Sequence, residues 1–88
     1  NEFDELFYQR GQAIAACNAA WSAFIESGCS PLHRPAKDAA EEHLAQIHYW
    51  IVERARTKRV PAYFRRQVYF LARVLLSDMC REHRRAAA

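Results

Sequence analysis

Glycine and proline, the residues that most often interrupt a helix, cluster at two places in this chain, with Gly11 as the exception. The first place is the segment GCSPLHRP, from Gly28 to Pro35, and the second is Pro61. Only two glycines and three prolines occur among 88 residues, which argues against a turn-rich all-β fold and against disorder. The chain therefore has room for three long segments and two short connections.

The first segment carries apolar residues three or four positions apart, which is the spacing of one helical face. We predict a helix over residues 2–27, with Asn1 as its cap and Gly28 at its end. Its opposite face is rich in alanine. The predicted inner face consists of Phe3, Leu6, Phe7, Ile14, Cys17, Trp21, Phe24 and Ile25.

The second segment predicts a helix over residues 35–57, with Pro35 in its first turn and cations at its end. Its predicted inner face consists of Ala40, His43, Leu44, Ile47, Trp50 and Ile51.

The third segment predicts a helix over residues 61–85, which Pro61 restarts. Its main apolar seam is Phe64, Val68, Leu71, Leu75 and Met79, and further apolar residues flank that seam on both sides. This helix is apolar over more of its circumference than the other two. Either it occupies the most enclosed position, or part of it faces another molecule.

Three helices of similar length with short connections predict an all-α fold. We expect one helical domain over residues 1–88, arranged as an up-down-up three-helix bundle, because 88 residues leave no room for two cores.

Four residues could in principle bind zinc in such a bundle, where the first loop and the end of the third helix share one pole. They are Cys29, His33, Cys80 and His83. Their spacing differs from that of the usual structural zinc motifs, and each has an ordinary interpretation as a loop or surface residue. We therefore predict no metal site and no cofactor.

No catalytic motif is recognisable in the sequence. The serines lack the context of a nucleophile elbow or a triad, and no glycine-rich phosphate loop occurs. We predict that the chain is not an enzyme and takes no small-molecule substrate. No apolar run approaches the length of a membrane span, and three irregularly spaced cysteines favour a reducing compartment, so we expect a cytoplasmic location.

Charge is divided unequally along the chain. Residues 1–44 hold three Lys/Arg against seven Asp/Glu, whereas residues 45–88 hold ten against three. The segment 54–66 suggests a nucleic-acid or acidic-partner surface made of Arg56, Lys58, Arg59, Arg65 and Arg66. Arg65 and Arg66 lie at a predicted helix start, where the dipole disfavours cations, so helix stability does not explain them. The alternative is a solvated, internally balanced surface.

A stripe beside the main seam of the third helix predicts a protein interface, because it combines aromatic residues with arginines. It consists of Tyr63, Arg66, Gln67, Phe70, Arg73 and Val74. We expect a small non-catalytic interaction or regulatory module that forms a homodimer or docks another protein through this stripe. Nucleic-acid binding through the 54–66 corner is the second hypothesis. A third interpretation buries the stripe inside the chain's own core.

Overall fold

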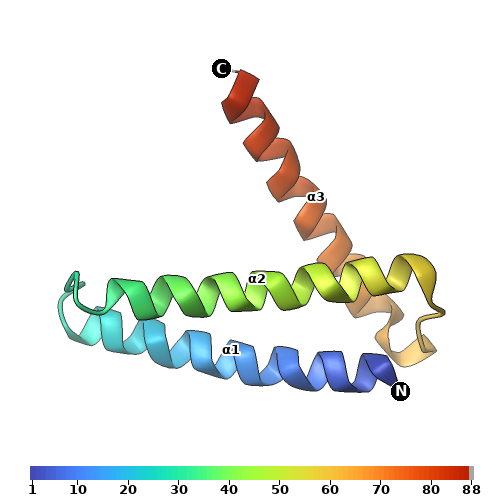
Figure 1. The fold of residues 1–88 in the computed structure, drawn as a ribbon, viewed down its shortest axis with the longest axis horizontal. Coiled ribbons are helices and arrows are strands. Elements are labelled where there is room, and N and C mark those ends of the chain that lie inside the picture. Colours follow the sequence, from blue (N-terminus) through green and yellow to red (C-terminus); the bar gives the residue numbers. More distant parts are fainter. Residues whose placement is uncertain (88) are drawn as a thin grey trace. The chain divides into compact units, whose positions relative to one another are not determined.

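A computed structural model describes residues 1–87 of the chain, and the side chains of Asp78, Met79, Cys80, Glu82, His83, Arg84 and Ala87 lie outside its description. Three α-helices and one short 3-10 helix follow one another: α1 (Glu2–Glu26), α2 (Arg34–Thr57), η1 (Ala62–Phe64) and α3 (Arg65–Ala87) (Figure 1). The prediction of an all-α chain is confirmed, since residues 1–87 contain helices and connections only. None of the helices in this range combines the length and apolarity needed to cross a bilayer.

The chain divides into two compact units, Asn1–Ile47 and His48–Ala88. The division falls within α2, so the first unit holds α1 with the beginning of α2, and the second holds the end of α2 with η1 and α3. The single domain and the up-down-up order stay predictions.

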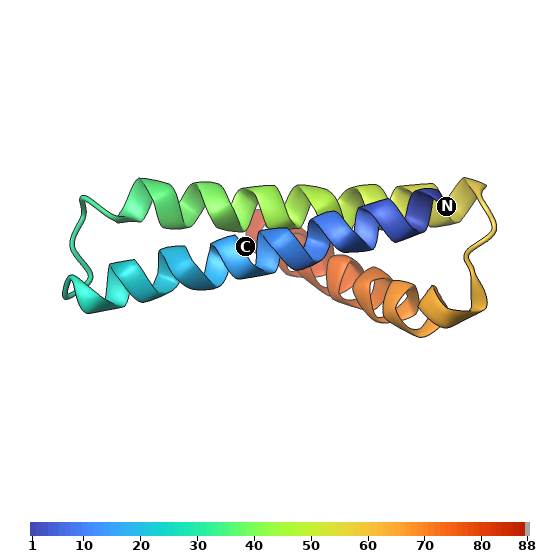
Figure 2. The same cartoon turned by 90° about the horizontal axis from the view of Figure 1, so that it is seen from below.

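In the first unit, α1 and the beginning of α2 run antiparallel and side by side (Figures 1 and 2). The backbone N–H of Phe3 donates to Asn1 Oδ1 at 2.8 Å, so Asn1 is the cap that the sequence predicts. The buried residues of α1 are Phe3, Ala13, Cys17 and Phe24.

Two expectations about the inner face of α1 are wrong. Trp21 is 40% exposed and Ile25 is 61% exposed, although both were expected in the core, while Ala13 is only 4% exposed. The face that α1 buries is narrower than its apolar spacing suggests. A short alanine side chain is fully covered where a neighbouring helix passes close by, whereas larger side chains at the edges of the face remain in solvent.

The same correction applies to α2. Ile47 and Ile51 are fully buried and lie one helical turn apart. His43 is exposed and Trp50 is 46% exposed, contrary to expectation, because both positions lie at the edge of the face that these isoleucines centre.

Lys37 of α2 forms ion pairs within its own helix and contacts aromatic rings of α1. Its Nζ lies 2.8 Å from Asp38 Oδ1 and 3.0 Å from Glu41 Oε1. The same ammonium lies 4.5 Å from the ring centroid of Trp21 and 5.5 Å from that of Phe24. Hydrogen bonds to Asp38 first, and then to Glu41, raise the pKa of Lys37 above its ordinary value. The charged ammonium lies over Trp21, where a cation–π interaction favours contact between α2 and this half-exposed ring of α1.

The end of α1 is a Schellman motif. The N–H of Cys29 donates to the carbonyl of Phe24 at 2.9 Å, and the N–H of Gly28 donates to that of Ile25 at 3.0 Å. Gly28 has φ 73°, a left-handed conformation that glycine adopts without the steric cost of a Cβ.

The two glycines predict opposite effects of one substitution. We expect Gly28→Ala to lower the free energy of unfolding by about 1–2 kcal/mol, because alanine must adopt the left-handed conformation. Gly11→Ala is expected to raise it by about 0.5–1 kcal/mol, because Gly11 lies inside α1 and a Cβ there meets nothing within 4 Å. Urea denaturation measures the free energy of unfolding of both variants. A change of the same sign in the two variants would contradict this prediction.

In the second unit, the chain turns after α2 and continues through η1 into α3 (Figure 1). Pro61 itself is extended, with φ −56° and ψ 144°, so it precedes the restart instead of beginning a regular helix. Residues 62–64 form η1, and α3 begins at Arg65, four residues later than expected. Ile51, Val68 and Leu71 are buried in this unit, while Phe64 and Leu75 are half-buried. The expected seam residue Met79 lies outside the described side chains.

Candidate interaction surface on α3

The predicted interface residues lie on η1 and α3, away from the buried seam of α3. Tyr63 is 67% exposed, Phe70 is 62% exposed and Val74 is 41% exposed. The polar members Arg66, Gln67 and Arg73 are exposed as well. Positions 67, 70, 74, 77 and 81 of α3 are three and four residues apart, so they follow one side of the helix, and Tyr63 on η1 continues the same spacing in the sequence. We call these six positions the Phe70 stripe.

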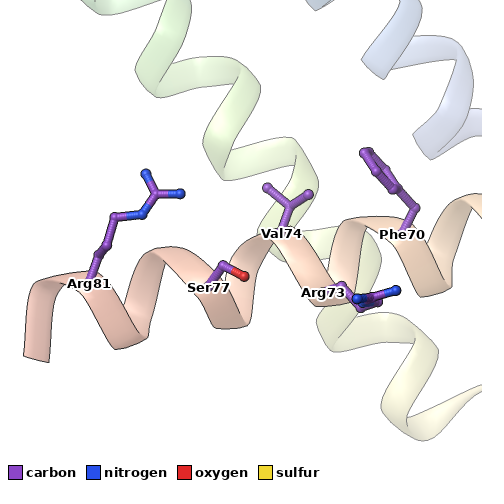
Figure 3. Close-up of a pocket in the computed structure, with 5 residues that line it drawn as sticks. All are labelled: Phe70, Arg73, Val74, Ser77 and Arg81. Atoms are coloured by element: carbon purple, nitrogen blue, oxygen red, sulfur yellow. The ribbon is translucent and has the colours of Figure 1, made fainter.

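Part of this stripe surrounds a hollow of about 360 Å³. The described residues that line it are Phe70, Arg73, Val74, Ser77 and Arg81. Figure 3 shows Phe70, Val74, Ser77 and Arg81 projecting from one side of α3, with Arg73 further round the helix. Sequence reasoning named Phe70, Arg73 and Val74 and missed the other two. The periodicity could have found them, since Ser77 and Arg81 lie two and three turns beyond Phe70.

The chemistry of this hollow suits a protein side chain. An aromatic ring and a branched aliphatic group supply apolar surface, and two guanidinium groups lie at its margin. Such a surface can cover an apolar side chain of a partner and pair with carboxylates around it.

The other flank of α3 is also partly apolar. Tyr69 is 66% exposed and Leu76 is 61% exposed, and they lie seven residues apart on one face. Arg73 lies between the two flanks, with its Cζ 5.9 Å from the ring centroid of Tyr69. Leu76 therefore matches Phe70 in exposure and helix while occupying a different face.

The basic corner is partly engaged in local interactions. Arg56 pairs with Glu53, at 3.1 Å between Nη1 and Oε1. Arg65 Nε donates to the carbonyl of Val60 at 3.3 Å, which gives this residue a structural role that sequence reasoning did not find. That bond holds the turn before α3, and it corrects the view that Arg65 has no local reason to be basic.

Three other cations of the 54–66 segment are exposed and can contact a partner molecule. Lys58, Arg59 and Arg66 are exposed and form no ion pair with any side chain that the structure describes. Tyr63, on η1, has its ring centroid 4.6 Å from that of Phe64.

Of the four potential zinc ligands, Cys80 and His83 lie outside the described side chains. Cys29 is an exposed free thiol in the first loop, and His33 is also exposed. Among the side chains that are described, no three His, Cys, Asp or Glu residues gather in a way that could hold a metal ion.

A second hollow, of about 350 Å³, lies in the first unit between Gln9, Gln12, Ala13, Ala16 and His43. Its two amides already have partners on their own helix. Gln9 Nε2 donates to Glu5 at 3.1 Å, and Gln12 Nε2 donates to the Tyr8 hydroxyl at 3.2 Å.

No protein-family model matches this sequence. Comparison with curated proteins and with solved structures finds no similar chain. The function is therefore argued from the Phe70 stripe itself.

Proposed function

We propose that this chain is a non-catalytic protein-interaction or regulatory module that associates through the Phe70 stripe, either with a second copy or with another protein. One observation carries the proposal: Phe70 and Val74, one turn apart on α3, are 62% and 41% exposed and line the same hollow. Single exposed apolar residues are common on protein surfaces, but adjoining ones around a concavity favour an interface.

Burial of these apolar side chains against a partner favours association. Full burial of one Phe or Val side chain contributes about 1.5–3 kcal/mol, and aromatic residues in a covered pocket frequently dominate binding. Tyr63 extends the same surface toward η1. The guanidinium group of Arg73, which lines the hollow, adds directional contacts.

We expect Phe70→Glu to weaken association at least about tenfold, because it places a carboxylate where a partner covers an apolar ring. Leu76→Glu is the matched control, since Leu76 has nearly the same exposure on another face of α3. Sedimentation across a concentration series measures the dissociation constant of the homodimer for each variant, and circular dichroism checks the fold. Equal effects of both variants would place the interface elsewhere. A chain that stays monomeric at about 100 μM excludes the homodimer. Titration with amphipathic helical peptides then decides whether the chain docks another protein.

Nucleic-acid binding at the 54–66 corner is the second candidate. The exposed ring of Tyr63 and the exposed side chains of Arg59 and Arg66 in the same segment support it, because single-stranded nucleic acid binds to cations interleaved with aromatic rings. It ranks lower because Arg56 and Arg65 are engaged within the chain. Anisotropy of a labelled single-stranded oligonucleotide should show affinity that falls with salt and is lost in Arg59→Ala/Arg66→Ala. No binding at low salt removes this candidate.

The proposal includes one domain with its helices in up-down-up order and a cytoplasmic location. Burial of Ile51, Val68 and Leu71 supports packing of α3 back toward α2. The free thiols of Cys17 and Cys29 suit a reducing compartment. Spin-label distances between α1 and α3 would test the helix order.

A further inference from the structure

The margin of the Phe70 stripe is cationic. The sequence from residue 65 to residue 87 contains six arginines and two acidic residues. Arg66 and Arg73 lie seven residues apart on the same margin, both exposed. Neither forms an ion pair with a side chain that the structure describes. A partner that covers Phe70 and Val74 therefore meets these two guanidinium groups.

The spacing of the stripe is that of a helix-binding seam. Positions 63, 67, 70, 74, 77 and 81 alternate steps of four and three, as do the contact positions of a heptad repeat. Arg66 and Arg73 occupy the position just before contact positions 67 and 74, where charges in coiled coils select the partner and its orientation. The hollow between Phe70 and Arg81 lies along this seam and can take one apolar side chain.

We propose that the partner of the Phe70 stripe is an acidic amphipathic helix of another protein, an inference that rests on the proposed function. Apolar side chains of that helix cover Phe70 and Val74 and fill the hollow, and its carboxylates pair with Arg66 and Arg73. Apolar contact supplies most of the affinity, while the charges select the partner and accelerate association.

A second copy of the chain fits this margin less well. An antiparallel pair that brings Phe70 opposite Val74 has its two-fold axis near residue 72. Arg73 of each copy then lies beside that axis, and two guanidinium groups of like charge approach each other. An acidic helix replaces this repulsion by attraction, so charge complementarity favours it over self-association.

Two synthetic peptides of three heptads provide the test. Both carry leucine at the contact positions, one with glutamate and the other with lysine at the flanking positions, and each is labelled for anisotropy titration with the full chain. We expect the glutamate peptide to bind at least about tenfold more tightly than the lysine peptide. Phe70→Glu should weaken its binding at least about tenfold, whereas Leu76→Glu should leave it within about twofold.

Charge reversal provides the sharpest control. Arg66→Glu/Arg73→Glu leaves the apolar seam intact, so it should remove the preference for glutamate and favour the lysine peptide. Equal binding of the two peptides, insensitivity to Phe70→Glu, or no binding overturns the acidic partner. If the chain self-associates through Phe70 and binds neither peptide, the proposed function stands and the occupant is a second copy. A monomer that binds neither peptide overturns both proposals.

Discussion

Replacing Phe3 with alanine is expected to lower the free energy of unfolding by about 3–5 kcal/mol, although the residue lies at the third position of the sequence. Its side chain is only 1% exposed, and the Asn1 cap fixes its backbone through the N–H of Phe3. Truncation removes a buried aromatic ring and leaves a cavity that its neighbours can fill only in part. Because a domain of this size has a total stability of about 5–15 kcal/mol, the loss would be a large share of it.

Phe70→Ala is the matched control for this prediction. It is the same change on a ring that is 62% exposed, and we expect an effect within about 0.5 kcal/mol for the monomer. Urea denaturation followed by circular dichroism at low protein concentration measures both, so that association does not contribute. Comparable losses for the two variants would show that Phe70 packs within the chain, which would also contradict the proposed interface.

We expect Ile51→Ala to lower the free energy of unfolding by about 2–5 kcal/mol. Ile51 is fully buried near the end of α2, in the unit that also buries Val68 and Leu71. The lost methyl groups contribute transfer free energy, and the remaining cavity adds to the cost because helical backbone relaxes little.

Ile25→Ala is the control for Ile51→Ala. Ile25 is 61% exposed, and its main role is a backbone one, since its carbonyl accepts from the N–H of Gly28. Alanine keeps that carbonyl in place, so the effect should stay within about 0.5 kcal/mol. A loss at Ile25 as large as that at Ile51 would mean that apolar spacing, and not the observed burial, describes the core of this chain.

The helices were predictable because their signals are local. Asn1 before the first apolar residue, Gly28 after the last one and Pro61 at the restart each act on neighbouring backbone groups. Only the start of α3 differs appreciably from expectation. There the extended conformation of Pro61 and the 3-10 turn of η1 delay the regular helix.

The extent of the core was less predictable, because periodicity gives the direction of a helical face and not its width. Trp21, Ile25 and Trp50 all have the correct spacing and are nevertheless half-exposed or exposed. Ala13 has no hydrophobic signal of its own and is buried. Whether an edge position is covered depends on how closely another helix approaches, and this is a property of the packed chain.

The candidate interaction surface could be predicted in part from helical spacing, and the rest required the burial that the structure shows. Spacing alone placed Tyr63, Phe70 and Val74 on one side of the third helix, but it was equally consistent with their burial. The structure leaves all three exposed and forms a hollow that Phe70 and Val74 line together with Ser77 and Arg81. It also shows that Arg65 holds the carbonyl of Val60, which no pattern of charges reveals.

For this protein, the sequence by itself determined the all-helical fold, the two connections and the charge of each half, because these follow from local backbone preferences and composition. Tertiary structure alone decided which apolar faces are covered, which arginines serve the chain's own turns and where the hollow forms. The width of each covered face depends on how helices pack, and the arginine contacts and the hollow depend on side-chain conformations, so apolar spacing by itself does not specify them.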